Sequence, residues 1–205
     1  LQRLDISNNK LTKLPEGLGL CSNLKFFKAH SNDIQLLPSS MGGCFRMEFI
    51  DVSRNKIREL PEDFSFMASL THIDCSGNRI GHLPHEIGNC KKLTYLDLSA
   101  NILVFLPESF SKLCDLEIFN CERNELILQP DRFNGCISLK DLRMKGNSTR
   151  HITTDIGACK SLMKFDASSN MIETIPTEIG LMTALEELDL SYNSLKTIPP
   201  GLASC

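Results

Sequence analysis

The chain has 205 residues, of which 41% are hydrophobic and 23% are charged, as in an ordinary folded protein. Its formal net charge of −3 gives no electrostatic reason to expect a nucleic acid or an anionic membrane as partner. No apolar run is long enough to cross a membrane, so we expect no membrane insertion, and no signal-peptide pattern opens the chain.

One 23-residue pattern runs through the whole chain. In its clearest form residues 93–106 read LTYLDLSANILVFL, and Pro107 follows. Leu96 and Leu98 alternate with polar residues as in a strand, and Asn101 then marks a tight bend. The pattern starts again at Leu1, Leu24, Met47, Leu70, Leu93, Leu116, Leu139, Leu162 and Leu185. Nine repeats without an insertion predict a solenoid in which each repeat contacts only its neighbours.

The first part of each repeat predicts a short strand with alternating inward and outward side chains, as at Leu4 and Ile6. Nine stacked strands would form one parallel sheet with about 4.8 Å between strands. The chain then turns at an Asn, whose amide carries donors and an acceptor for the backbone groups that the turn leaves unpaired. This Asn is present in every repeat: Asn9, Asn32, Asn55, Asn78, Asn101, Asn124, Asn147, Asn170 and Asn193.

The second part of each repeat predicts a short outer segment. Pro opens this segment in eight repeats, at Pro15, Pro38, Pro61, Pro84, Pro107, Pro130, Pro176 and Pro199. A fixed φ and a missing N–H suit the start of a single helical turn. Repeats six and seven depart from the pattern, since Gln129, Thr149 and Thr153 take positions that are apolar or Pro elsewhere. Polar groups at inward positions cost stability unless they are hydrogen-bonded.

Eight of the nine cysteines stand at inward positions of the repeat, with Cys75 and Cys121 at a position that is otherwise Leu, Val or Ile. Six share one position, at Cys21, Cys44, Cys90, Cys136, Cys159 and Cys205. Met or Leu fills that position in the other repeats, so these cysteines behave as small hydrophobic residues. We therefore expect reduced core thiols and a cytoplasmic location, with Cys114 outside the core. Bridges between Cys21 and Cys44, or between Cys136 and Cys159, remain an alternative.

The pattern L-x-x-L-x-L-x-x-N-x-L resembles the leucine-rich repeat family in all nine repeats. Its continuation, as in Leu11-Thr-Lys-Leu14-Pro15, is similar to the intracellular class of Ras-pathway scaffolds and of the Scribble and Erbin polarity proteins. The resemblance implies a curved α/β solenoid with one parallel sheet on its concave face and an Asn ladder. It also implies end caps, which residues 1–205 lack, so we expect a fragment.

No arrangement of residues indicates catalysis. His82 and His85 have a spacing that would suit a metal on a helix, but Pro84 lies between them and no further ligand repeats the spacing. The recurring Asp residues belong to the L-D-L-S phrase of the family. We therefore expect a protein that is not an enzyme and needs no cofactor or metal.

Outward strand residues are expected to line the concave face in columns. One column contains an apolar run at Phe26, Phe49, His72, Tyr95 and Ile118. A charged block follows it at Glu122, Arg143 and Lys145, together with Arg123 and Asp141. Aromatic residues beside charges are typical of protein interfaces, although aromatics also pack across strands for structural reasons alone.

The sequence thus favours a non-catalytic intracellular scaffold that binds a folded protein on its concave face. Small GTPases, phosphatase subunits or kinases are partners that the resemblance alone implies. One alternative is the sensor or substrate-recruiting segment of a larger enzyme, such as a GTPase–kinase, a phosphatase or a ubiquitin ligase. Another alternative is the ectodomain of an extracellular recognition receptor.

Overall fold

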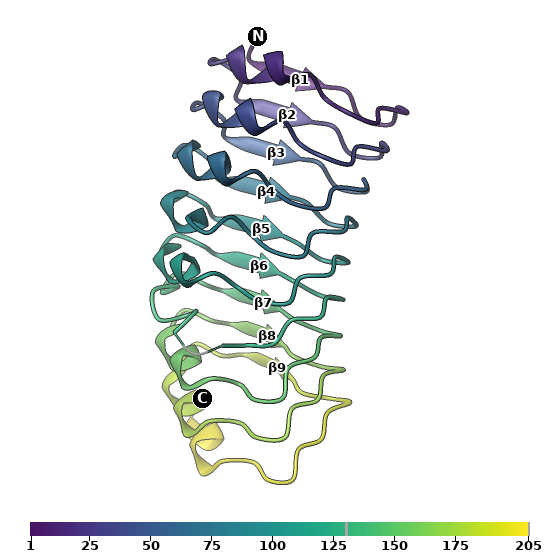
Figure 1. Ribbon diagram of the computed structural model, residues 1–205. Helices are drawn as coiled ribbons and strands as arrows, with labels where there is room; N and C mark the ends of the chain where they lie inside the picture. Colours follow the sequence, from purple (N-terminus) through teal and green to yellow (C-terminus); the bar gives the residue numbers. More distant parts are fainter. Residues whose placement is uncertain (130, 205) are drawn as a thin grey trace.

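The computed structural model describes residues 1–129 and 131–204, and it is a single curved stack of repeats (Figure 1). Nine parallel strands form one sheet in the order of the sequence, from β1 to β9. The strands are β1 Arg3–Asp5, β2 Phe26–Lys28, β3 Phe49–Asp51, β4 His72–Asp74, β5 Tyr95–Asp97, β6 Ile118–Asn120, β7 Asp141–Arg143, β8 Lys164–Asp166 and β9 Glu187–Asp189. The predicted solenoid with one parallel sheet is confirmed.

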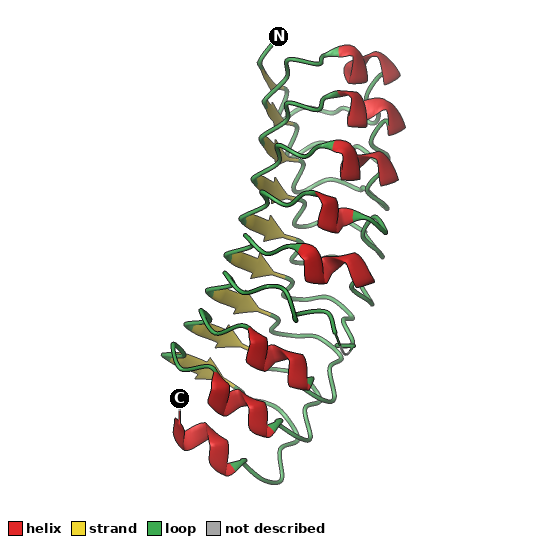
Figure 2. Cartoon of the chain, turned by 90° about the vertical axis from the view of Figure 1, so that its left-hand side faces the viewer, coloured by secondary structure: helices red, strands yellow, loops and turns green. Residues whose placement is uncertain are grey.

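The outer layer consists of short 3-10 helices on the side opposite the sheet (Figure 2). They are η1 Glu16–Leu20, η2 Ser39–Gly43, η3 Glu62–Phe66, η4 Ile87–Asn89, η5 Glu108–Lys112, η6 Thr154–Ala158, η7 Thr177–Leu181 and η8 Pro200–Ser204. Pro directly precedes six of them, as predicted for the start of a single turn. No helix of the described part is long and apolar enough to span a membrane.

Close contact between neighbouring outer turns explains a recurrent Gly. A Cβ atom added to Gly88 would lie 2.0 Å from the carbonyl oxygen of Ser109 in the next repeat. Only Gly lets two backbones approach this closely.

The core runs along the solenoid between the sheet and the outer turns. Each inner strand residue between Phe27 and Phe165 is at most 1% exposed. Phe64, Phe110 and Phe133 fill the space beneath the outer turns and are fully buried. The ring centroid of Phe110 lies 4.9 Å from that of Phe119 and 5.9 Å from that of Phe133. Aromatic packing therefore joins the sheet to the outer layer and one repeat to the next.

The Asn side chains form a ladder of hydrogen bonds between repeats. The Nδ2 of Asn101 donates to the carbonyl oxygens of Leu98 at 2.9 Å and of Cys75, in the preceding repeat, at 3.0 Å. Its Oδ1 accepts the N–H of Ile80 at 2.8 Å, also from the preceding repeat. Each internal Asn thus satisfies backbone groups of two repeats that turning would otherwise leave buried and unpaired.

The turn before each ladder Asn has a left-handed backbone. Ala100 has a φ of 53°, and the equivalent residues of the other repeats have φ between 52° and 69°. Only Gly77 and Gly146 adopt this conformation without steric cost. The other residues cost about 1–2 kcal/mol each, which the ladder must offset.

Repeats six and seven differ from the others in the outer layer. Leu128 is buried and Gln129 is only partly buried, which reverses the pattern of the equivalent positions in the other repeats. The expectation that Gln129 takes the inward position is therefore wrong. The hydroxyl of Thr149 is fully buried but donates to the carbonyl oxygen of Leu126 at 3.0 Å. Pro130 lies outside the described residues, and the described part of residues 116–138 contains no helix.

A buried carboxylate takes part in this altered region. The Oδ2 of Asp155 accepts the backbone N–H of Phe133 at 2.7 Å. The side-chain oxygens Thr153 Oγ1 and Asp155 Oδ1 are buried without a hydrogen-bond partner among the described residues. The outer layers of repeats six and seven are thus joined by polar contacts, whereas most other repeats have Pro and a 3-10 turn at these positions.

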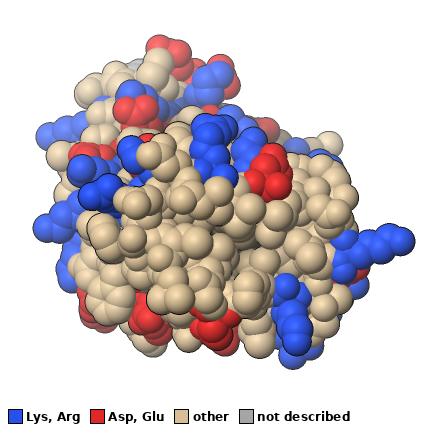
Figure 3. Space-filling model, turned by 90° about the horizontal axis from the view of Figure 1, so that it is seen from above, with Lys and Arg blue, Asp and Glu red and all other residues tan. Residues whose placement is uncertain are grey.

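Core residues of the first and last repeats are only partly buried. At one end they include Leu4, Ile6 and Leu11, and at the other Leu188 and Leu190. Seen from the N-terminal end, the molecule presents a broad central area without charged residues, with Lys, Arg, Asp and Glu side chains around it (Figure 3). The apolar stack is therefore open at both ends of residues 1–205, as a solenoid without polar end repeats would be.

The cysteines at the shared position point into the core. Cys44, Cys90, Cys136 and Cys159 are fully buried, and Cys205 lies outside the described residues. The Sγ atoms of Cys44 and Cys90 each lie 3.4 Å from a carbonyl oxygen of the preceding repeat, as weak donors. Burial raises the pKa of Cys90 to about 11 and that of Cys159 to about 12. Cys114 is exposed, as predicted.

We expect replacement of a ladder Asn to destabilise the fold strongly. Asn101→Leu should lower the free energy of unfolding by about 3 kcal/mol, because buried backbone groups of two repeats lose their partners. The measurement is chemical denaturation, with Ser99→Ala as the control on the outward side of the same turn. Equal losses in both variants would contradict the assigned inward register.

We expect two classes of thiol in the folded protein. The exposed Cys114 should react rapidly with a thiol reagent at neutral pH. The buried thiols should react far more slowly, because they are both inaccessible and protonated. Time-resolved labelling followed by peptide mapping measures both classes, and denaturation should make all sites react fast. Rapid native labelling at Cys90 or Cys159 would disprove their burial.

Candidate protein-interaction surface on the concave face

Outward strand residues form columns on the concave face because the strands pair without a shift. Arg3 pairs with Phe26, Phe26 with Phe49, and so on in steps of one repeat along the sheet. The structure thus places Phe26, Phe49, His72, Tyr95 and Ile118 side by side on consecutive strands. Residues that are far apart in the sequence become one surface.

The aromatic residues of this column stack on one another. We name Phe26, Phe49, His72 and Tyr95 the aromatic ridge. The ring centroids of Phe49 and His72 lie 4.4 Å apart and those of His72 and Tyr95 4.1 Å apart, with interplanar angles of 10° and 4°. Phe26 lies 6.2 Å from Phe49. The guanidinium carbon of Arg3 lies 4.5 Å from the Phe26 ring centroid and closes the stack at one end as a cation–π contact.

The ridge is half-buried, so each ring keeps an edge in solvent. It stands on fully buried residues of the same strands, such as Phe27 and Ile50. Burial lowers the pKa of His72, against the opposing effect of Asp74, Asp51 and Asp97. The imidazole is thereby held neutral, which suits its place between two rings. Each ring is held in position by its neighbours, so the ridge is ordered before any partner binds.

A column of carboxylates runs beside the ridge, at Asp51, Asp74 and Asp97. The Oδ1 of Asp74 accepts both the N–H and the hydroxyl of Ser76, at 2.9 Å and 2.7 Å. Asp51 makes the same two contacts with Ser53. These Asp residues therefore cap the turn after each strand, which gives the recurring L-D-L-S phrase a structural reason.

Tyr95 connects the ridge to this column. Its hydroxyl donates to Oδ2 of Asp97 at 3.3 Å, and Asn120 donates to the same oxygen at 2.9 Å. Burial, together with nearby Asp97 and Asp74, raises the pKa of Tyr95 to about 12. The phenol thus stays protonated and keeps its hydrogen bond at physiological pH.

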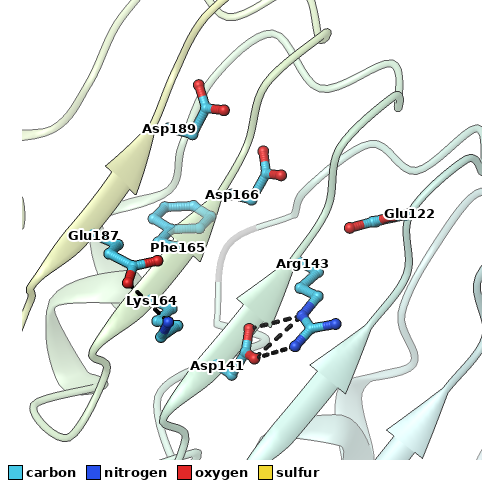
Figure 4. Close-up of a pocket in the computed structure, with 8 residues that line it drawn as sticks. All are labelled: Glu122, Asp141, Arg143, Lys164, Phe165, Asp166, Glu187 and Asp189. Atoms are coloured by element: carbon cyan, nitrogen blue, oxygen red, sulfur yellow. Dashed lines mark hydrogen bonds and ion pairs between the residues drawn. The ribbon is translucent and has the colours of Figure 1, made fainter.

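A charged hollow occupies the other half of the concave face (Figure 4). It is lined by Glu122, Asp141, Arg143, Lys164, Phe165, Asp166, Glu187 and Asp189. The guanidinium of Arg143 bonds Asp141 at 2.6 Å, and Lys164 bonds Glu187 at 2.8 Å (Figure 4). Ion pairing therefore neutralises both cations of the hollow and leaves Glu122, Asp166 and Asp189 without an ion pair among the described residues.

The structure brings two of the three predicted charged site residues together in the hollow. Glu122 and Arg143 line the hollow, whereas Lys145 is exposed outside that lining set. Sequence reasoning did not select Lys164 and Glu187, although their equal position in adjacent repeats and opposite charge would have revealed the pair. Ile118 pairs with Tyr95 in the sheet and is partly buried between the ridge and the hollow.

His82 and His85 are both exposed. The backbone N–H of His85 donates to the carboxylate of Glu62 at 2.9 Å. Within residues 1–129 and 131–204, no three His, Cys, Asp or Glu side chains are placed to share a metal ion.

We expect the neutral state of His72 to make stability pH-dependent. Its folded-state pKa is depressed, so below about pH 6.5 the unfolded chain takes up a proton that the folded protein resists. The stabilisation of the folded state by neutral His72 is therefore fully present above that pH and is lost as the pH falls. His72→Phe should reduce the drop in free energy of unfolding between about pH 7.5 and 5.5. His82→Gln, at an exposed position, is the control. An unchanged drop in His72→Phe would contradict the assignment.

The sequence matches the family described as Leucine Rich Repeat over residues 1–21, 69–90, 92–113 and 184–205. No curated protein matches the chain. Among solved structures, a leucine-rich repeat protein of Leptospira interrogans is 27% identical with a TM-score of 0.80, and the alignment covers 100% of this chain and 58% of that one.

A second similar structure is the leucine-rich repeat ectodomain of the membrane receptor kinase GASSHO1/SCHENGEN3 from Arabidopsis thaliana, in complex with CASPARIAN STRIP INTEGRITY FACTOR 2. It is 30% identical with a TM-score of 0.87 over 99% of this chain and 26% of that one. An internalin of Listeria monocytogenes, 18% identical with a TM-score of 0.85 over 100% of this chain and 58% of that one, shares the fold. The chain thus spans less than two thirds of these proteins. With nine repeats in register on one parallel sheet, it has the fold of a leucine-rich repeat solenoid, and four segments of its sequence match the model of that family.

Proposed function

We propose that this chain is a non-catalytic module that binds another protein on its concave face, with the aromatic ridge as the centre of the interface. The observation that supports this proposal is the continuous stack from Phe49 through His72 to Tyr95, whose edges remain in solvent. Leucine-rich repeat domains are generally protein-interaction modules, and solenoids present such extended concave surfaces for binding.

The physical state of the ridge favours this role. Aromatic side chains at interface centres contribute much of the binding energy. Ordering free side chains on binding costs about 0.5–1.5 kcal/mol each, but the rings of the ridge are already held by their neighbours. A partner that covers the ridge would therefore gain the burial of apolar edges at little entropic cost.

The charged block is proposed to have a different part in binding. Arg143 and Lys145 lie on the strand and the following turn beyond the ridge, both exposed. Exposed charges at the rim of an interface act mainly on orientation and association rate, and their effect is screened by salt.

We further propose that the module is part of an intracellular signalling scaffold, in the cytoplasm, with a small GTPase, a phosphatase subunit or a kinase as the class of partner. The fully buried thiols at the shared cysteine position support a reducing compartment, since they are packed as small hydrophobic residues. The same surface would serve the sensor or substrate-recruiting segment of a larger enzyme equally well.

Extracellular recognition is a second candidate function, and one specific observation favours it. The plant ectodomain that resembles this chain was solved in complex with CASPARIAN STRIP INTEGRITY FACTOR 2. In that case the concave face of this chain would belong to a receptor and would bind a secreted ligand.

We expect the ridge to carry most of the binding energy. Phe49→Ala and Tyr95→Ala should each weaken partner binding by about 2 kcal/mol, roughly 30-fold, because apolar contact at the interface centre is lost. Partners are first isolated with the full-length parent protein by affinity purification and mass spectrometry, and their affinities are then measured by titration.

Phe66→Ala is the matched control, since it removes the same side chain from η3 on the outer face, where Phe66 is 65% exposed. Glu108→Ala in η5 is a second outer-face control. All variants must keep the circular dichroism spectrum of the parent. Unchanged affinity in both ridge variants, with a loss in Phe66→Ala, would move the interface to the outer face.

A further inference from the structure

We infer that the partner segment bound at the aromatic ridge is basic, with at least two Arg or Lys side chains placed on the carboxylate column Asp51–Asp74–Asp97 and apolar side chains placed on the ridge. This inference rests on the proposed function and adds the chemistry of the partner to it.

The carboxylate column holds negative charge that no cation neutralises. Neither Asp51, Asp74 nor Asp97 has an ion pair within the part of the chain that the structure describes, although six ion pairs occur elsewhere in it. These three residues also lie on adjacent strands, with Asp51 paired with Asp74 and Asp74 with Asp97. Like charges in one column repel each other, so a cationic partner would relieve both the repulsion and the missing pairing.

The column is also partly withdrawn from water. Asp97 is only 8% exposed, and Asp51 and Asp74 are intermediate. Burial raises the pKa of Asp74, against the hydrogen bonds from Ser76, and the neighbouring Asp97 and Asp51 raise it further. Electrostatic attraction is stronger at a partly buried site than in open solvent, so a cation bound here gains more than at an exposed carboxylate.

Two of the three carboxylates keep one oxygen without a hydrogen-bond donor among the described residues. The Oδ1 atoms of Asp51 and Asp74 are occupied by the serine two residues later, whereas no described residue donates to their Oδ2 atoms. At Asp97 the Oδ2 is already taken by Tyr95 and Asn120. Asp51 and Asp74 are therefore the two positions that an incoming guanidinium or ammonium would use.

Cations of the chain near the column do not fill this role: Arg54 lines a hollow together with Asp51 and Asp74 but forms no ion pair with them in the described part of the chain. Lys28 pairs with Asp51 in the sheet, but its Nζ lies over the Phe49 ring, 5.4 Å from the centroid. Arg143 is bound to Asp141. The middle of the concave face thus combines an apolar ridge with an acidic column, a pattern that repels nucleic acids and anionic membranes and complements a basic segment of a protein.

Spacing indicates how such a segment would lie. Ridge and column belong to residues two apart on the same strands, so they form parallel rows across the sheet. Asp51 and Asp74, the two positions open to a cation, are one strand spacing apart, about 4.8 Å, a distance that long and flexible Arg or Lys side chains can match. An extended peptide between the rows directs alternate side chains to opposite sides, with about 6.8 Å between those on one side. Alternating apolar and basic residues would therefore contact the ridge and the column together.

The test uses a fluorescent hexapeptide of alternating Leu and Arg, with a peptide of alternating Leu and Glu as the charge-reversed comparison. Binding is followed by fluorescence polarisation at about 50 and 300 mM NaCl, with EDTA present so that no metal ion mediates it. The Arg peptide should bind at least about tenfold more tightly than the Glu peptide at low salt and should lose part of its affinity at high salt.

The double variant Asp51→Asn with Asp74→Asn removes two charges while it keeps the turns. Asn120 shows that an amide is accepted, since its Oδ1 takes the N–H of Glu122 at 3.1 Å in the same arrangement. Affinity for the Arg peptide should fall about fivefold or more. Asp5→Asn is the matched control. Asp5 accepts the N–H of Ser7 in the same way and stands in the same column, but it lies in β1 at the end of the sheet, away from Asp51 and Asp74. It should change affinity by less than about twofold.

Failure of this inference is distinguishable from failure of the proposed function. Equal binding of both peptides, no binding of the Arg peptide, or unchanged affinity in the double variant would overturn the basic partner. The same results would leave the ridge as an interface if Phe49→Ala still weakens binding of the natural partner. Loss of Arg-peptide binding in both the double variant and Phe49→Ala, with Asp5→Asn unaffected, would support ridge and column as one site.

Discussion

The hydrogen-bond ladder of Asn side chains is the constraint on which the rest of the molecule depends. Every repeat must reverse its chain direction inside the protein, and each reversal leaves backbone groups without sheet partners. An Asn that bonds its own repeat and the preceding one satisfies them, as Asn101 does with Leu98, Cys75 and Ile80. Since one amide serves two repeats, the strand and the turn up to the Asn must keep the same spacing in neighbouring repeats. The ladder therefore fixes this part of every repeat, despite a left-handed backbone at the residue before each Asn.

A fixed period turns sequence positions into columns on a surface. Side chains 23 residues apart meet across adjacent repeats, as in the ion pairs of Lys25 with Glu48 and of Lys164 with Glu187. The same rule brings Phe49, His72 and Tyr95 into one stack. The sheet spacing of about 4.8 Å is wider than the contact distance of two flat rings, so the rings must tilt or lean to stack. The observed centroid distances of 4.4 and 4.1 Å show that they do.

The 23-residue period and the pattern of inward apolar residues were enough to predict the sheet, its strand order and its register, because every repeat has the same strand and turn at the same positions. The columns followed from the register, and so did the side-by-side placement of the residues in the column that begins at Phe26 and ends at Ile118. What the sequence could not provide depends on side-chain geometry. Stacking of His72 between two rings, the capping of Ser76 by Asp74 and the pairing of Arg143 with Asp141 all require rotamers. The position of Gln129 was wrong for a related reason: Leu128 is buried instead, and a pattern of fixed offsets does not predict which of two neighbouring residues lies inward.

The break in the outer layer coincides with a change of character on the concave face. The ridge ends at β5, the charged hollow draws on β7, β8 and β9, and β6 lies between them. Repeat six, which contains β6, is also the repeat whose described outer residues form no 3-10 helix. In a solenoid, stability is nearly a sum over repeats and their shared interfaces, so one irregular repeat weakens local contacts without disturbing distant ones. The ladder is intact through this region, since Asn124 and Asn147 still bond the preceding repeats. The sheet can therefore hold both halves of the surface in fixed register, while the outer layer of repeat six departs from the common pattern at a cost that stays within that repeat.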